Sequence, residues 1–126
     1  MRQQYHSRKV GNDTYIWNVN RLVKMAEGFP VKEIPLAQIK ELDELFWYED
    51  ANTPTCRSVA DHAKLIEETD LKYPVLLCSK GRVIDGMHRV CKAYMQGLKR
   101  IKVVQFENDP DPDYMNVDLE NLPYDD

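Results

Sequence analysis

The pattern of hydrophobic and polar positions changes its period between residues 74 and 106. A continuous apolar run, Val75–Cys78, is typical of a buried strand, and Val83 and Ile84 follow it after a polar turn. Apolar residues then recur at helical spacing, at Met87, Val90, Cys91, Tyr94 and Met95. Gly97 lies where a left-handed C-terminal cap belongs. The pattern predicts a hairpin, a helix and then a last strand over 101–106.

Weaker patterns precede this region. Asn18 is a candidate N-cap for a helix that ends at Gly28, and the proline-flanked residues 29–36 predict a short strand. Thr55 or Ser58 is expected to cap a second helix. Its apolar stripe would consist of Val59, Ala63, Leu65 and Ile66. The order of these elements predicts an α+β fold in which helices pack on a small mixed sheet.

The two ends of the chain differ from its middle. Residues 1–14 are polar and without periodicity, which indicates that residues 1–17 form a loose arm, anchored at its end by Tyr15, Ile16 and Trp17. Residues 18–106 carry the predicted elements and form the expected domain. Residues 107–126 are acidic but also contain apolar side chains, so we expect this tail to pack partly on the body. The simplest interpretation of its acids is that they provide solubility.

Composition sets the class of protein. The chain has 126 residues, 43% of them hydrophobic and 30% charged, as in an ordinary soluble domain. It shows no apolar run of membrane-spanning length and no signal peptide, and three widely spaced cysteines make neither a disulfide framework nor a zinc site. These features predict a cytoplasmic protein with no membrane partner.

Charge is unevenly distributed along the chain. The net charge is −4, but the tail holds 8 acidic and no basic residues, which leaves 13 acidic against 17 basic residues in 1–106. The body is therefore mildly basic.

The candidate chemistry lies where the hairpin meets the helix, in the sequence Asp85-Gly86-Met87-His88-Arg89. Gly86 permits a tight turn, and the helix that follows offers unpaired N–H groups with a partial positive charge. Arg89 adds a fork of donors that matches phosphate. An anion site is the functional interpretation; the alternative is that Asp85 and Gly86 only shape the turn.

The segment Gly81–Phe106 with its Asp-Gly-Met-His-Arg core resembles the signature of the ParB/sulfiredoxin superfamily. The resemblance extends back to Pro54-Thr55-Cys56-Arg57 and to the strand at Tyr73–Leu77, and covers roughly residues 30–106. It implies the superfamily fold and nucleotide phosphates bound at the turn, with ATP or CTP as the nucleotide. The whole chain is similar to small bacterial ParB-like proteins.

At two points the sequence differs from particular branches of this superfamily. Sulfiredoxins carry a catalytic cysteine before the histidine, where this chain has Met87, and a thioether cannot replace a thiolate. Cys91, one turn further, is interpreted as a structural residue. The glutamate and paired arginines of ParB are also absent, and the turn is closest to that of the serine-kinase-like members.

The first functional hypothesis is a nucleotide-binding domain, with phosphotransfer or nucleotide hydrolysis as its activity. Backbone amides of Gly86, Met87 and His88 would hold phosphates, with Arg89 and Arg57 as cationic clamps. Thr55 and Ser58 form a second group of candidate phosphate ligands, or act only as helix caps. Asp85 would hold Mg²⁺ or accept a proton, or only stabilise the turn.

The second hypothesis is a non-catalytic adaptor or regulatory module of ParB-like ancestry, with a degenerate site. DNA is an improbable partner for this chain alone, because the chain is net acidic and no helix-turn-helix follows the signature. Nucleotide is the expected partner, and the acceptor and the oligomeric state are left open.

Two further features have open interpretations. The adjacent Phe46, Trp47 and Tyr48 either stack a base or, as we favour, fill the core. His62 lies in the middle of a predicted helix and is expected at the surface rather than in a ligand site.

Overall fold

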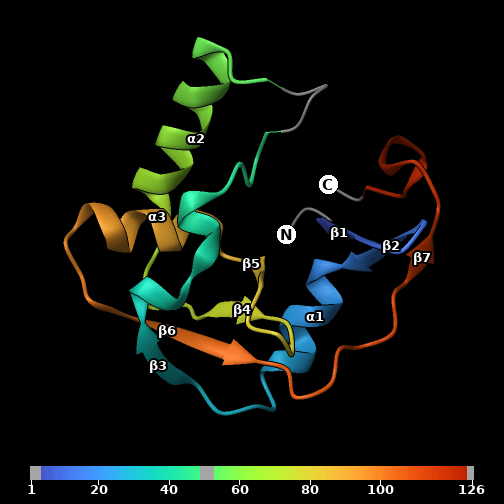
Figure 1. The fold of residues 1–126 in the computed structure, drawn as a ribbon, viewed down its shortest axis with the longest axis horizontal. Coiled ribbons are helices and arrows are strands. Elements are labelled where there is room, and N and C mark those ends of the chain that lie inside the picture. Colours follow the sequence, from blue (N-terminus) through green and yellow to red (C-terminus); the bar gives the residue numbers. More distant parts are fainter. Residues whose placement is uncertain (1–3, 49–52, 125–126) are drawn as a thin grey trace.

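The computed structural model describes residues 4–48 and 53–124, and it has the predicted α+β class (Figure 1). Its centre is a four-stranded sheet in the order β3-β6-β4-β5. The strands are β3 (Lys32–Pro35), β4 (Val75–Leu77), β5 (Val83–Asp85) and β6 (Arg100–Gln105). β4 runs parallel to β6, and the other pairs are antiparallel, so the sheet is mixed as predicted.

Alternate residues of the strands fill two separate cores, because successive side chains of a strand point to opposite faces. On one face Val75, Leu77 and Val103 pack under α3 (Met87–Met95) and the 3₁₀ turn η1 (Leu36–Gln38). On the other face Leu76 and Val104 pack against α1 (Val19–Ala26). The sheet thus separates two faces with different neighbours.

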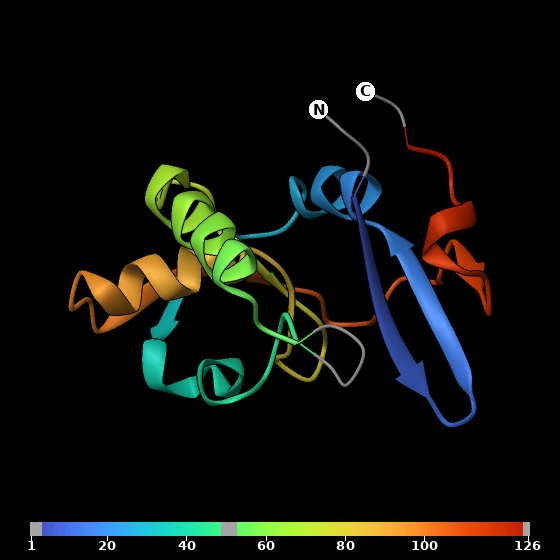
Figure 2. The ribbon, with the colours of Figure 1, turned by 90° about the horizontal axis from the view of Figure 1, so that it is seen from above.

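Residues 5–18 form a β-hairpin where the sequence led us to expect a loose arm. β1 (Tyr5–Val10) pairs with β2 (Asp13–Asn18), and β2 also pairs with the short β7 (Tyr114–Met115). Figure 2 shows this hairpin as a long ribbon beside the main sheet, on the side away from α2 and α3. The expectation missed a local signal, the two-residue turn Gly11-Asn12 between Val10 and Asp13, in which Gly11 has φ 63°. The third strand, in contrast, comes from the far end of the chain, which local patterning does not reveal.

Tail residues make specific contacts with the body. The Trp17 indole donates to the carbonyl of Pro110 over 2.8 Å, and Leu122 of the tail, just after η3 (Leu119–Asn121), is buried. Asp113 accepts from the backbone of Asn18 over 2.7 Å, and Asp109 accepts from the backbone of Ser79 over 2.7 Å. These two acids therefore hold the tail in place, beyond the solubility role first given to them. Residues 1–3 and 125–126 lie outside the described part.

The helix α2 (Cys56–Glu68) stands apart from the sheet and packs mainly on α3 (Figures 1 and 2). It has no buried residue, and its predicted apolar stripe is largely exposed, with Val59 at 52% and Leu65 at 47%. A second 3₁₀ turn, η2 (Lys40–Asp43), precedes it in the chain. In the described residues no helix has both the length and the apolar character needed to cross a bilayer.

Candidate functional site

The turn between β5 and α3 has the geometry that its sequence predicts. Gly86 is the N-cap of α3 and has φ 104°, a left-handed conformation that residues with side chains rarely adopt. α3 then begins at Met87, so the amides of its first turn have no partner within the helix. The Met87 side chain is buried in the core, which leaves only its backbone for the site. The turn therefore presents backbone donors at a positive helix end.

Arg89 folds back over this turn. Its Nη2 lies 3.1 Å from Oδ2 of Asp85 and 3.2 Å from the carbonyl oxygen of Pro74. A methyl group on Gly86 would come within 2.8 Å of the same Nη2, so glycine is needed for this close approach. The Arg89 Nε is buried and has no hydrogen-bond partner within the described chain. The guanidinium is thus held in place, with its hydrogen-bonding capacity partly unused.

An apolar pocket of about 790 Å³ opens beside the Asp85–Arg89 pair. Its other residues come from α1, the segment before β3, and strands β4 and β6: Val23, Ala26, Glu27, Phe29, Val31, Tyr73, Pro74, Leu76 and Val104. Glu27 is exposed, and the aromatic rings of Phe29 and Tyr73 are also partly exposed, at 39% and 55%. The pocket is therefore an apolar cavity with one polar end, the usual design of a small-molecule site.

His88 points to a different set of neighbours. Its Nε2 lies 2.9 Å from Nδ1 of His62 on α2, and the Trp47 ring stacks on both imidazoles, at 4.2 Å from His62 and 4.6 Å from His88. Burial lowers the pKa of His88, helped by His62 and Arg89 and opposed by Asp85. His88 is therefore uncharged at neutral pH, and its contribution to anion binding would come from its backbone.

The His62–His88–Trp47 cluster corrects two interpretations. His62 is half-buried and bonded to His88, where a solvated surface position was expected. Trp47 packs at the edge of the core and on the two histidines, while the neighbouring Phe46 is exposed, so the aromatic triplet does not fill the core as a unit. No sequence signal joins residues 47, 62 and 88, which come from three separate elements.

The second group of predicted ligands lies at the N-terminus of α2. The Thr55 hydroxyl accepts from the backbone of Ser58 over 3.1 Å, so Thr55 is the N-cap, and the Ser58 hydroxyl donates to Tyr48 over 2.9 Å. Arg57 is exposed. This end of α2 points away from α3 (Figure 1), and no hydrogen bond or ion pair among the described residues links it to the Asp85–Arg89 turn. Residues 85–89 thus share one turn. Residues 55–58 are connected to it through Tyr48, which bonds Ser58 and whose ring lies 5.8 Å from that of His62, the partner of His88.

Metal and thiol chemistry have little support from the described side chains. Within residues 4–48 and 53–124 there is no group of three or more His, Cys, Asp or Glu side chains that could hold a metal ion. Asp85 alone could contribute to a magnesium ion that also binds phosphates, since Mg²⁺ is often held by one or two carboxylates and a phosphate ligand. Burial raises the pKa of the half-buried Cys91 thiol, which disfavours its reactive thiolate form.

Comparison of the chain with family models, with curated proteins and with solved structures finds no match.

Proposed function

We propose that the chain is a nucleotide-binding domain, with the phosphates at the Asp85–Arg89 turn and the base in the adjoining apolar pocket. One observation carries this proposal: Asp85 and Arg89 form the polar end of a pocket whose other walls are apolar and partly aromatic. A ligand that fits must combine a flat apolar part with an anionic part. Nucleotides have this combination, and the resemblance of the turn to the ParB/sulfiredoxin signature favours the same class.

The phosphate end of the proposed site depends on Arg89 and the first turn of α3. Helix N-termini stabilise anions through free amides and the helix dipole. The Arg89 side chain is 16% exposed and is paired with Asp85, so a phosphate would share this guanidinium with the carboxylate. The unpartnered Nε shows that Arg89 is not saturated by its present contacts.

The base end depends on Phe29 and Tyr73, whose exposed rings border the pocket. An aromatic side chain that stacks on a base contributes about 1–3 kcal/mol, with little preference among bases. The pocket volume of about 790 Å³ lies within the usual range for ligands of nucleotide size.

The ion pair between Asp85 and Arg89 favours binding over phosphotransfer. A general base or magnesium ligand needs a free carboxylate oxygen, and Oδ2 of Asp85 is engaged by Arg89 at 3.1 Å. Phosphotransfer or hydrolysis would have to use the other carboxylate oxygen, Oδ1, for Mg²⁺ or for an acceptor hydroxyl, with Arg89 still bound to Oδ2. The non-catalytic module with a nucleotide-responsive site is the second candidate, and this engaged carboxylate is the observation in its favour.

The test is calorimetric titration of the chain with ATP, CTP and GTP, with and without Mg²⁺. Arg89→Gln should weaken binding by about 1.5–3 kcal/mol, the range for charge-assisted hydrogen bonds. Tyr73→Ala should weaken it by about 1–3 kcal/mol through loss of stacking. Because Tyr73 is 55% exposed, that change should leave the fold intact.

Tyr94→Ala is the matched control for Tyr73→Ala, since Tyr94 is 67% exposed near the C-terminal end of α3 and does not line the pocket. Arg100→Gln is the matched control for Arg89→Gln, because Arg100 is exposed on β6 and does not line the pocket. If neither Tyr73→Ala nor Arg89→Gln differs from its control while circular dichroism shows an intact fold, the proposed site is wrong. Absence of binding by the wild-type chain to every nucleotide would reject the function itself.

A further inference from the structure

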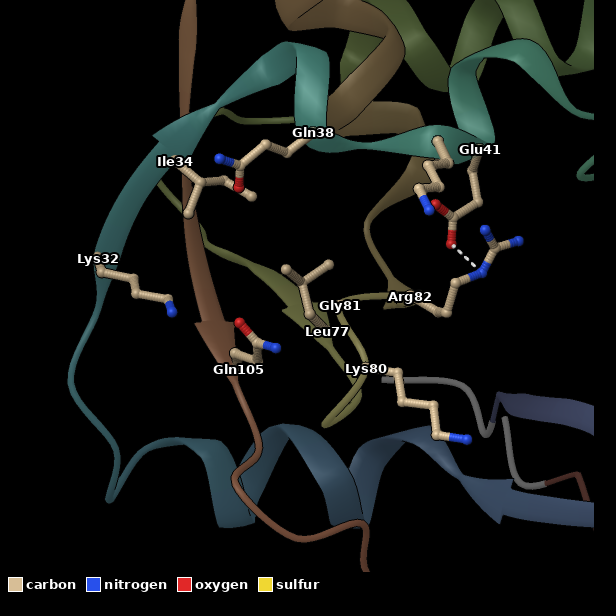
Figure 3. A pocket seen from close by; sticks show the side chains of 10 residues that line it. Lys32, Ile34, Gln38, Glu41, Leu77, Lys80, Gly81, Arg82 and Gln105 are labelled. Carbon is tan, nitrogen blue, oxygen red and sulfur yellow. Dashed lines mark ion pairs between the residues drawn. The ribbon is translucent and has the colours of Figure 1, made fainter.

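A second pocket lies on the α3 face of the four-stranded sheet, at the end where β6 finishes (Figure 3). It encloses about 290 Å³ and is bordered by β3, the turns η1 and η2, the β4–β5 connection and Gln105 of β6. This volume is at the lower limit for small-molecule sites, so the ligand must be smaller than a nucleotide. Neither the turn at residues 85–89 nor its apolar pocket contributes to it.

The charge of this pocket is strongly positive. Lys32, Lys40, Lys80 and Arg82 line it, and Glu41 is the one acid among its lining residues. Arg82 is paired with the carboxylates of Glu41 and Glu44. Within the described chain, no ion pair involves the other three cations. Three ammonium groups without ion pairs among the described residues favour a compact anion of more than one charge, such as a phosphate group, although the charge of Lys40 also acts on Glu44.

Glu41 adds an independent indication. It is only 3% exposed, and its Oε2 accepts from the backbone of Val83 over 2.5 Å and lies 3.5 Å from the Arg82 Nε. Its other oxygen, Oε1, is buried and has no hydrogen-bond partner among residues 4–48 and 53–124. A buried acceptor without a donor is costly, and few occur in folded proteins. A ligand that brings a donor to Oε1 would remove this cost.

The long side chains around Glu41 can admit such a ligand. Gln38 and Lys40 are exposed, so they can turn aside without disturbing the core. In Figure 3 Lys32 extends from β3 toward Gln105, while Lys80 lies on the other side of Gln105 and extends away from it, so its side chain would have to turn back to contact a ligand. The Gln105 Nε2 donates to the carbonyl of Ser79 over 3.1 Å, which fixes the amide at this end of the pocket.

We propose that this pocket binds a small phosphate ester that also carries a hydroxyl group, that is, a phosphorylated polyol or sugar. The phosphate would lie among Lys32, Lys40 and Lys80, and a hydroxyl would donate to Oε1 of Glu41. A simple divalent cation does not fit, because the lining is positive overall. A nucleic acid backbone does not fit either, because the cavity is small and enclosed on several sides.

The probes are glycerol 3-phosphate, inorganic phosphate and glycerol, titrated against the full chain and followed by calorimetry or by amide chemical shifts. We expect saturable binding of glycerol 3-phosphate, at least tenfold weaker binding of inorganic phosphate, and none of glycerol. Equal binding of the ester and of inorganic phosphate would overturn the role given to Glu41 and with it the ligand class. Absence of saturable binding of the ester would overturn the site.

Two variants locate the binding. The double change Lys32→Gln with Lys80→Gln should weaken glycerol 3-phosphate binding at least tenfold. Its matched control is Lys24→Gln with Lys64→Gln, which removes the same charge from exposed positions on α1 and α2. Equal weakening by both pairs would show a net-charge effect and reject the pocket.

Glu41→Gln tests the hydroxyl contact and preserves the side-chain shape. The amide can still accept from Val83, and it then places an NH₂ group where Oε1 was, so a ligand hydroxyl loses its acceptor. Binding of the ester should fall to the level of inorganic phosphate, and phosphate binding itself should not fall. An unchanged preference for the ester would overturn the proposal, and if this variant does not fold, the lysine pair and its control decide.

Discussion

The sheet has an acid–arginine pair beside a pocket on each of its faces. The two pairs differ in which residue, the arginine or the acid, has an atom without a hydrogen-bond partner among the described residues. Asp85 and Arg89 lie at the apolar pocket, and the unpartnered atom is the Arg89 Nε, a donor. Glu41 and Arg82 lie at the basic pocket, and the unpartnered atom is the Glu41 Oε1, an acceptor. The same two chemical groups can thus favour different ligands, because a ligand complements the atom that the protein leaves unsatisfied.

The pairs also differ in how the chain builds them. Asp85 and Arg89 are four residues apart on one turn, and both side chains keep some contact with solvent, at 26% and 16% exposure. Glu41 lies in η2, far in sequence from Val83 and Arg82, and it is almost completely buried. The first pair belongs to a local turn, and the second fastens two distant segments together. We therefore expect the second pair to contribute more to stability than the first.

The largest expected effect is the destabilisation caused by Glu41→Ala. The change leaves the Val83 amide without its acceptor and opens a void at the edge of the core, which together should cost about 3–4 kcal/mol. Asp85→Ala removes a partly exposed pair and should cost no more than about 1 kcal/mol. Urea denaturation at pH 7 measures both free energies of unfolding.

Glu44→Ala is the control for this comparison, because Glu44 contacts the same Arg82 guanidinium from an exposed position. We expect it to change stability little. Equal costs for Glu41→Ala and Asp85→Ala would show that the buried pair does not fasten the two segments.

The next effect is the dependence of the free energy of unfolding on pH. His6 lines a small cavity together with Glu41 and Arg82. His88 is the corresponding histidine of the other pair and lies next to Asp85 and Arg89. Burial, with the Arg8 charge, lowers the pKa of His6 from 6.5 to about 4. Above pH 6.5 His6 is neutral in both folded and unfolded chains and does not affect stability. Below that pH His6 is protonated in the unfolded chain but remains neutral in the folded chain until the pH approaches 4.

The free energy of unfolding should therefore fall as the pH drops from 6.5 to 4, by about 3 kcal/mol for His6 alone. His88 acts in the same direction, since its pKa is also lowered. His6→Phe keeps an aromatic ring beside Trp17 and removes the titrating group. Urea titrations of both proteins across this pH range should diverge, with the variant less sensitive to acid. Parallel curves would show that His6 is not the group responsible.

Local sequence patterns predicted the elements that carry the first pair. The run Val75–Cys78, the αL glycine at 86 and the helical spacing from Met87 each act through neighbouring residues, and the structure has the corresponding hairpin, turn and helix. The Asp85–Arg89 contact spans only four residues. Short-range periodicity and turn chemistry are enough to anticipate such features.

The second pair and the pairing of β7 with the β1–β2 hairpin could not be anticipated in this way. Glu41 in the sequence resembles any acid in a polar turn, and only the approach of Val83 makes it a buried acceptor. The pairing of Tyr15 with Met115 joins residues from opposite ends of the chain. The contact of His62 with His88 depends on how α2 docks on α3. These features follow from tertiary packing, which a single sequence does not display.

The smallest expected effect on stability, and the sharpest test of the apolar site, is Asp85→Asn. Asn keeps the shape of the side chain and an oxygen that can accept from Arg89, so the free energy of unfolding should change by less than about 1 kcal/mol. If the site only binds nucleotide, the Asp85 carboxylate repels the phosphates and competes with them for Arg89. Its neutralisation should then tighten nucleotide binding by about 1 kcal/mol, close to fivefold, with no dependence on Mg²⁺.

The opposite result identifies a catalytic carboxylate. If Asp85 holds Mg²⁺ or accepts a proton during phosphotransfer, Asp85→Asn should abolish the metal dependence of binding or lower turnover by about 10²–10⁴-fold. Titration with and without Mg²⁺, beside an assay for nucleotide hydrolysis, separates the two outcomes in one pair of proteins. Tighter, metal-independent binding together with no wild-type turnover would reject phosphotransfer. It would show that the Asp85 carboxylate weakens nucleotide binding by competing with the phosphates for Arg89. Glu41→Gln offers the contrast, since it should leave nucleotide binding unchanged because Glu41 lies on the other face of the sheet.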